Sequence, residues 1–241
     1  MDLIREISPN DRMMTPRYPD TYFLWGDSAL RCIQIAMVAV GKREVAKILD
    51  FPCGHGRVLR TLKAAYSDAS LTACDIDRDG VDFCEATFGA AGVYSDDDLD
   101  SVQLGGDFDL IWVGSLFTHL PADRWTALLD FLADRLAPAG LLVFTTHGTW
   151  YAERIRDEES LLGGVSQDAQ SEMLRGFDED GFGFACYPGR DAYGLSLSAP
   201  SAVTNHLQRL RRLRITLYLE RGWRGHQDVV ACQNGFTTPD A

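Results

Sequence analysis

The residues best suited to chemistry lie in a short turn at positions 50–56, with the sequence Asp-Phe-Pro-Cys-Gly-His-Gly. Gly54 and Gly56 allow a tight turn in which a ligand can approach bare backbone beside the N-terminus of a following helix. Asp50 stands at the start of this turn, where its carboxylate favours a ligand that carries positive charge. The turn therefore predicts a binding site for a cationic small molecule.

A second acidic residue, Asp75, follows the next apolar segment, nineteen positions after Gly56. A carboxylate at that place can accept hydrogen bonds from both hydroxyls of a ribose. This arrangement is shared by nicotinamide dinucleotides and by S-adenosylmethionine (SAM). Asp75 therefore indicates an adenosine ligand without choosing between the two.

The glycine spacing and Asp50 favour SAM over a dinucleotide. The dinucleotide fingerprint Gly-x-Gly-x-x-Gly needs a third glycine, and that position falls on Arg57 or Leu59, depending on the register. Asp50 would repel a pyrophosphate, whereas it would attract the sulfonium and ammonium groups of SAM. An NAD(P)-dependent oxidoreductase and a non-catalytic SAM-binding protein remain the alternatives.

Short apolar strands alternate with helices around this turn, which is typical of a parallel sheet covered on both faces. We expect helices at 28–41, 57–66, 79–88 and 122–136, and strands at 45–50, 70–75, 92–95, 108–114 and 141–146. Residues 149–194 break the pattern and are expected to be a long irregular insertion. A helix at 201–212 and strands at 214–220 and 228–233 follow. The short link between these last strands makes them antiparallel neighbours.

From about residue 20 to residue 233, the chain resembles the class I SAM-dependent methyltransferases. Within that family, it is similar to the methyltransferases of types 11 and 12, which act on small molecules. The segment 50–56 matches the family's acidic-x-Gly-x-Gly-x-Gly loop, with Pro52 in place of the first glycine. The segments 72–77, 108–112 and 136–142 are similar to the ribose-binding segment, the fourth strand and the turn before the fifth. The resemblance implies an α/β, doubly wound, Rossmann-like sheet of order 3-2-1-4-5-7-6 with strand 7 antiparallel.

The candidate site residues follow from the turn and from this resemblance. We expect the cofactor to be held by Asp50, Pro52, Gly54, Gly56, Asp75, Ile76, Asp96 and Gly114. His119 and His147 end or follow strands at the carboxyl edge of the sheet. An imidazole there suits a general base, although each histidine could equally be structural. Acceptor contacts are expected from Tyr22, Trp25, Tyr151 and Tyr193.

Composition limits the partners of this 241-residue chain. The net charge of −12 argues against a general nucleic-acid surface, since phosphate binding draws on excess Lys and Arg. The six cysteines show no metal-ligand spacing, no metal is expected, and no apolar run is long enough to span a bilayer.

We expect one cytoplasmic domain, monomeric or homodimeric, with an N-terminal lid at 1–27 and a substrate-side insertion at 149–194. Its substrate is predicted to be a small organic acceptor such as a sugar, glycan or secondary metabolite, with O-methylation favoured over N-methylation.

Overall fold

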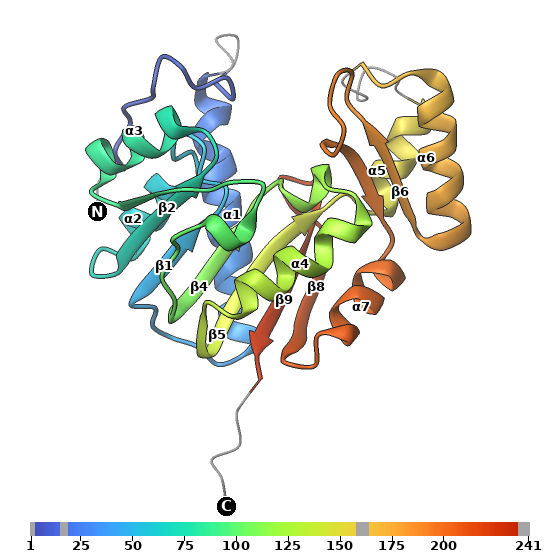
Figure 1. Ribbon diagram of the computed structural model, residues 1–241. Coiled ribbons are helices and arrows are strands. Elements are labelled where there is room, and N and C mark those ends of the chain that lie inside the picture. Colours follow the sequence, from blue (N-terminus) through green and yellow to red (C-terminus); the bar gives the residue numbers. More distant parts are fainter. Residues whose placement is uncertain (1–2, 15–18, 158–163, 236–241) are drawn as a thin grey trace, which may run out of the picture.

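The computed structural model describes residues 3–14, 19–157 and 164–235. A seven-stranded sheet lies at its centre, in the order β3-β2-β1-β4-β5-β9-β8 (Figure 1). Its first five strands in the chain pair in parallel: β1 (Lys47–Asp50), β2 (Ser70–Asp75), β3 (Ala91–Tyr94), β4 (Phe108–Val113) and β5 (Leu136–Thr146). The last strand, β9 (Gln227–Asn234), runs antiparallel to both β5 and β8 (Leu213–Trp223). The expected doubly wound α/β sheet with an antiparallel end strand is confirmed.

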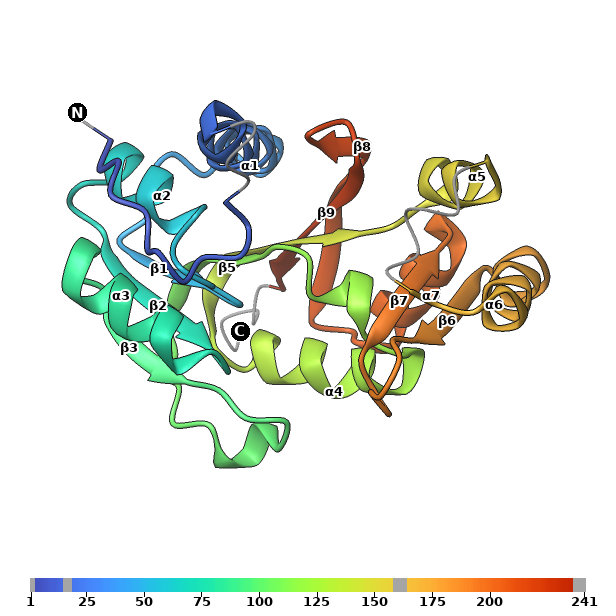
Figure 2. The same ribbon diagram turned by 90° about the horizontal axis from the view of Figure 1, so that it is seen from above.

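Helices cover both faces of the sheet, as Figure 2 shows from above. Neighbouring strand residues alternate between two cores: Ile48 packs in one, beneath α1 (Pro19–Ala39), α2 (Leu59–Ala65) and α3 (Arg78–Phe88), and Leu49 in the other. The second core lies beneath α4 (Ala122–Ala133) and α7 (Pro200–Arg209). Burial on both faces explains why the strands read as continuous apolar runs rather than as an alternating pattern.

Several element boundaries differ from those expected. The first helix begins at Pro19 rather than near residue 28, so residues 19–27 form its first turns instead of a separate segment. Helix α4 ends at Ala133, and β5 already begins at Leu136. The turn-like sequence Pro-Ala-Gly at 138–140 is absorbed by β5, whose register with β4 shifts between Phe108 and Leu110.

The expectation of an irregular segment at 149–194 is wrong. The described part of this segment contains helices α5 (Thr149–Asp157) and α6 (Gln167–Asp180) and the hairpin of β6 (Phe182–Cys186) and β7 (Gly194–Ser198), which together form a small layer beside the carboxyl ends of the strands (Figure 1). This layer has its own apolar core, which includes Tyr151, Met173 and Leu195. Residues 158–163 lie outside the described residues.

Within the described residues, we find no helix with both the length and the apolar character needed to cross a membrane. All six cysteines are free thiols, and only Cys186 is exposed. The thiols therefore contribute to packing and do not cross-link the fold.

Candidate functional site

A cavity of about 970 Å³ lies at the carboxyl ends of β1, β2 and β4, the edge where open α/β sheets bind their ligands. Four parts of the chain line it: the N-terminal segment 9–13, the turn after β1, the ends of β2 and β4 with the segments that follow them, and the C-terminal and insertion residues Trp223 and Tyr193. The cavity therefore joins the predicted adenosine site to the predicted acceptor side.

The turn after β1 contains Pro52. The Phe51–Pro52 peptide bond is cis. The N–H of Cys53 donates to the carbonyl of Cys74 at 3.0 Å, and this hydrogen bond connects the turn to the neighbouring strand β2. Gly54 and Gly56 both have positive φ, of 48° and 74°. A Cβ on Gly54 would point into open space, whereas one on Gly56 would overlap with the ring of Phe88. Gly54 thus presents bare backbone to the cavity, and Gly56 packs the turn onto α3.

Asp50, at the end of β1, is one of the residues that line this cavity. The residue is only 1% exposed, and its Oδ2 atom is buried without a hydrogen-bond partner in the described structure. Burial, followed by the nearby charge of Asp75, raises the pKa of Asp50 well above its usual value. A buried acceptor of this kind is costly unless a donor reaches it, so the site is suited to a cationic group.

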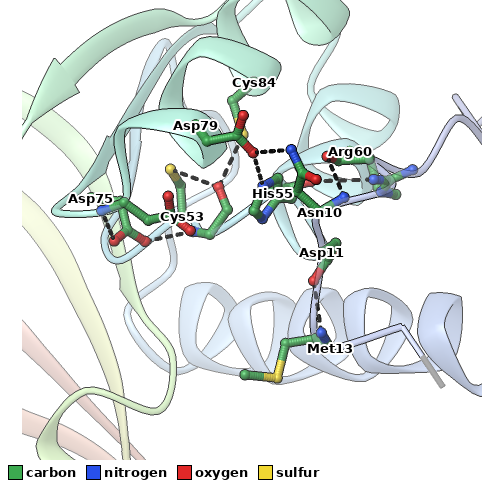
Figure 3. A network of polar contacts seen from close by, with 12 residues as sticks. Asn10, Asp11, Met13, Cys53, His55, Arg60, Asp75, Asp79 and Cys84 are labelled. Atoms are coloured by element: carbon green, nitrogen blue, oxygen red, sulfur yellow. Dashed lines mark hydrogen bonds and ion pairs between the residues drawn. The ribbon is translucent and has the colours of Figure 1, made fainter.

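Asp75, at the end of β2, is oriented by the backbone around it. Its Oδ2 accepts from the Gly54 N–H at 2.7 Å, and its Oδ1 accepts from the Asp77 N–H at 2.9 Å (Figure 3). Burial raises the pKa of Asp75, and these two hydrogen bonds oppose that rise. A carboxylate has about four lone-pair sites, so the Asp75 carboxylate can accept further hydrogen bonds, such as those from ribose hydroxyls.

The N-terminal segment forms a wall of the cavity. Asn10 donates from Nδ2 to Asp79 Oδ2 at 3.0 Å, and the Nε2 atom of His55 lies 2.8 Å from the same oxygen (Figure 3). The buried guanidinium of Arg60 donates to the carbonyls of Ile4 and Glu6 at 3.0 and 2.6 Å. The segment is therefore tied to both the turn and the helix that follows it.

His119 lies in a 3-10 turn (Phe117–His119) that follows β4, and it lines the cavity. Its Nδ1 atom is 2.7 Å from the carbonyl oxygen of Gly194, which accepts but cannot donate. Nδ1 must therefore carry the proton, and the neutral ring presents a lone pair on Nε2. Burial lowers the pKa of His119 below 6.5, and the Gly194 hydrogen bond only partly offsets that effect. His119 is thus a neutral base at neutral pH.

His147 lies behind His119, with a ring-centroid distance of 6.3 Å, and is not among the residues that line the cavity. Its ring stacks in parallel on Tyr151, with centroids 3.7 Å apart. Burial holds the pKa of His147 well below its usual value. Of the two candidate bases, only His119 is brought to the cavity surface.

The other predicted residues divide between the cavity and its surroundings. Pro52, Gly54, Gly114 and Tyr193 line the cavity, and Tyr193 stacks on His119 with centroids 5.1 Å apart. Tyr22 is buried beside the wall, where its hydroxyl donates to Asp11 at 2.6 Å. Trp25 packs edge-to-face on Trp223. Ile76 is 61% exposed, and Asp96 is an exposed residue whose carboxylate accepts from the Asp98 N–H.

Most of the cavity-lining residues were not anticipated as site residues, and Asn10, Ser115 and Trp223 are examples. Asn10 and Trp223 lie far from the turn in sequence, and neither belongs to a recognisable motif. Ser115 follows Gly114 and has a positive φ of 59°, which is uncommon for a residue other than glycine. Its position directly after the apolar strand β4 was the one signal available in the sequence. Across the described ranges, no group of three or more His, Cys, Asp or Glu side chains is placed to hold a metal ion.

Comparison with known proteins identifies the domain. Residues 48–140 match the family model described as a methyltransferase domain. No curated protein matches the chain.

Many solved structures are similar in fold. One is an S-adenosylmethionine-dependent methyltransferase from Clostridium acetobutylicum, with a TM-score of 0.58, 15% identity, and coverage of 88% of this chain and 91% of that one. Another is N-methyltransferase NodS from Bradyrhizobium japonicum, with a TM-score of 0.52, 15% identity, and coverage of 87% and 95%. Human N-acetylserotonin methyltransferase in complex with SAM gives a TM-score of 0.55 at 14% identity, with coverage of 87% of this chain but only 51% of that one. This chain thus spans about half the length of the human enzyme.

Residues 48–140 thus match a methyltransferase domain, and the described chain has the fold of the solved methyltransferases named above.

Proposed function

We propose that the protein transfers a methyl group from SAM to an oxygen of a small organic acceptor. The observation that carries the proposal is the cavity itself. It is lined by Asp50, which has an unpaired buried oxygen, by Asp75, whose carboxylate is oriented by the backbone, and by the neutral His119. Asp50 would accept from the ammonium group of SAM, and Asp75 would accept from the ribose hydroxyls. Pro52, Gly54 and Gly114 would provide the backbone surface between them.

SAM supplies an already activated methyl group, which is displaced in line by the acceptor atom. The protein's contribution is then to hold the acceptor in line with the methyl group and to exclude water. His119 would take the hydroxyl proton on Nε2, because Nδ1 is committed to the Gly194 carbonyl. The Tyr193 ring, stacked on His119, would cover an acceptor bound there.

Other predicted residues would act at the edges of this site. His147 and Tyr151 would support His119 from behind through their stacked rings. Tyr22 and Trp25 would hold the cavity wall rather than contact the acceptor. Ile76 and Asp96 would lie at the adenine end, beyond Asp75. The lid would be the described N-terminal segment 3–14, and the acceptor side would be the α5–β7 layer.

The O-methylation proposal depends on the chemistry of His119. A neutral hydroxyl must lose its proton during methyl transfer, and a buried neutral imidazole suits that step. Sugars, glycan ends and secondary metabolites with hydroxyl groups are the acceptor classes we propose, with amines second. We further propose a cytoplasmic protein that acts as a monomer or homodimer without nucleic acid or membrane partners.

Thermal unfolding in the presence of different nucleotides tests the donor. SAM and S-adenosylhomocysteine (SAH) should raise the unfolding temperature, because they bind the folded state, whereas NAD and NADP should not. Stabilisation by a dinucleotide alone would instead support the oxidoreductase alternative. Binding of SAM without methyl transfer to any member of a broad panel of alcohols, phenols and amines would support a non-catalytic SAM-binding protein.

A further inference from the structure

Ser115, in the loop that follows β4, lines the cavity in a constrained backbone conformation. Its φ of 59° lies in the left-handed region, which is uncommon for residues other than glycine. Such conformations persist only where the surrounding structure holds them, and they cluster at functional sites. The elements around Ser115 must therefore hold it in place.

Two buried side chains from neighbouring strands do so. The backbone N–H of Ser115 donates to the Oγ1 atom of Thr145 in β5 at 2.8 Å. The Nε2 atom of Gln227, at the start of β9, donates to the Oγ atom of Ser115, also at 2.8 Å. Thr145 is fully buried and Gln227 is 5% exposed, so neither can turn toward water instead. Both the backbone and the side chain of Ser115 are thus fixed at the cavity surface.

The hydrogen bond from Gln227 determines what the Ser115 hydroxyl can offer to a ligand. A hydroxyl has one donor hydrogen and two acceptor lone pairs, and Gln227 occupies one of those lone pairs. None of the hydrogen bonds found in the described part of the chain uses the hydroxyl hydrogen of Ser115. This hydrogen is therefore available to a molecule bound in the cavity.

His119 provides the opposite kind of group in the same loop. It lies four residues after Ser115, it also lines the cavity, and its Nδ1 atom is committed to the Gly194 carbonyl, so Nε2 accepts. The loop after β4 thus offers a bound alcohol one hydroxyl donor and one imidazole acceptor. An isolated hydroxyl uses only the imidazole, whereas a molecule with a second oxygen beside the first uses both groups.

We propose that Ser115 donates a hydrogen bond to a second oxygen of the methyl acceptor, beside the hydroxyl whose proton passes to His119. The methylated oxygen loses that proton to Nε2 and gains the methyl group of SAM, which leaves as SAH, while the second oxygen stays unmodified. The preferred acceptor is then a vicinal diol, as in a sugar ring or a catechol. The inference rests on the proposed function and narrows its acceptor class. Ser115 is the residue that determines this specificity, and Thr145 and Gln227 are positioning residues.

Matched pairs of alcohols test this preference. Catechol is compared with phenol, and cis-1,2-cyclohexanediol with cyclohexanol, by kcat/KM for methyl transfer. Ser115→Ala should lower kcat/KM for the diol of each pair roughly 3- to 12-fold, the range for one neutral hydrogen bond. It should leave kcat/KM for the mono-alcohol within about twofold of wild type. Because each compound is measured with both proteins, differences in intrinsic reactivity cancel.

Binding provides a readout that does not depend on turnover. Calorimetry with SAH-saturated protein should show weaker binding of catechol, but not of phenol, to Ser115→Ala, and the affinity for SAH itself should be unchanged. Ser115→Gly should behave in the same way, since it also lacks the hydroxyl, and glycine adopts the positive φ without strain. Agreement between the two variants assigns the effect to the hydroxyl rather than to the backbone.

Ser101 provides a matched control. Its hydroxyl donates to the carbonyl of Asp98 at 2.7 Å, and Ser101 is not among the cavity-lining residues. Ser101→Ala should therefore treat all four alcohols as the wild type does. A loss of diol preference in Ser101→Ala would show that the effect is not specific to the cavity, and the inference would be overturned.

The other outcomes separate this inference from the proposed function. If Ser115→Ala lowers kcat/KM for both members of each pair equally, or for neither, Ser115 does not recognise a second oxygen, although the protein is still a methyltransferase. Weaker SAH binding by Ser115→Ala would place the hydroxyl in the cofactor site and also overturn the inference. The same holds if SAH-bound wild type neither binds nor methylates the diols, or prefers the mono-alcohols. If the wild type does not bind SAH, the proposed function itself fails.

Discussion

The Nδ1 atom of His119 donates a hydrogen bond to the carbonyl oxygen of Gly194, 75 residues away in the sequence, at 2.7 Å. His119 follows β4 of the central sheet, and Gly194 begins β7 of the added layer. The contact therefore fixes the tautomer of the proposed base and, at the same time, fixes the added layer against the cofactor domain. Because the bond leaves the lone pair on Nε2, the acid–base role depends on both parts of the fold.

His119→Ala should abolish most methyl transfer while leaving SAH affinity nearly unchanged. General-base catalysis contributes roughly 10²- to 10⁴-fold to the rate, which sets the expected loss. Because burial lowers the pKa of His119, wild-type activity should fall only when the pH drops below 6.5. The measurements are methyl-transfer rates against pH and SAH calorimetry. His206→Asn is a suitable control, since His206 packs on Trp125, away from the cavity. Undiminished turnover in His119→Ala would make this histidine structural.

Asp50→Asn should have opposite effects on stability and on binding. With the folded pKa of Asp50 above its unfolded value of 3.8, ionisation costs stability as the pH rises from 3.8 through the folded pKa. The ligand-free variant should therefore be more stable than wild type at neutral pH. It should also bind SAH more weakly, since the ammonium group loses its counter-charge.

Urea unfolding at pH 7 and calorimetry at several pH values measure these two effects. Wild-type SAH affinity should rise with pH as Asp50 ionises, and that part of the rise should be missing in Asp50→Asn. If the Asp50→Asn variant is less stable than wild type and binds SAH with the same affinity, the assignment is contradicted.

Asp75→Ala should weaken the binding of SAH roughly 10- to 100-fold, because it removes the acceptor for the ribose hydroxyls. The loss should be the same for 5′-methylthioadenosine, which keeps the ribose but lacks the amino-acid portion. Asp82→Ala is the matched control, because Asp82 lies on α3 and bonds the Tyr94 hydroxyl outside the cavity. An unchanged dissociation constant for Asp75→Ala would refute the ribose role.

The two glycines of the turn should respond differently to alanine. Gly56→Ala adds a Cβ that overlaps with Phe88, in a backbone conformation that costs about 1–2 kcal/mol for an L-residue. It should therefore destabilise the fold markedly. Gly54→Ala meets no neighbouring atom, so it should cost about that strain alone and yet impair SAH binding. Equal unfolding free energies for the two variants in urea would show that the turn does not pack as described.

Arg60 should prove a structural cation rather than a ligand-binding one. It is 1% exposed and donates to the carbonyls of Gly56, Ile4 and Glu6. Arg60→Met leaves these acceptors unsatisfied and should cost about 2–4 kcal/mol of unfolding free energy. Arg175→Met should change stability by less than about 0.5 kcal/mol, because the Arg175–Glu172 pair is exposed. Digestion of the N-terminal segment by a protease should be faster in Arg60→Met, and equal rates would contradict its role as an anchor.

The sheet could be predicted from sequence because its signals are local. The strand β2 was expected at 70–75 and is observed at Ser70–Asp75, since an apolar run bounded by polar residues marks it at both ends. The added layer could not be predicted in the same way. In α6 only Gln170, Met173 and Phe177 are buried, so the helical period rests on two apolar side chains. Helix α6 packs against β6 and β7, and these contacts with neighbouring elements are not visible in the periodicity of α6 itself.

The candidate site shows the same division. Asp50 and Asp75 carry local signals, because each ends an apolar strand. The wall formed by Asn10 and the stacking of Tyr193 on His119 depend on long-range contacts. Sequence alone could therefore indicate the cofactor but not the shape of the acceptor side.

A crystal structure of the SAH complex would test the central claim most directly. The account predicts the ribose hydroxyls at Asp75, the homocysteine ammonium at Asp50, and the sulfur atom on the side of the cavity lined by His119 and Tyr193. A nucleoside bound in the reverse direction, with its sulfur remote from His119, would contradict the account.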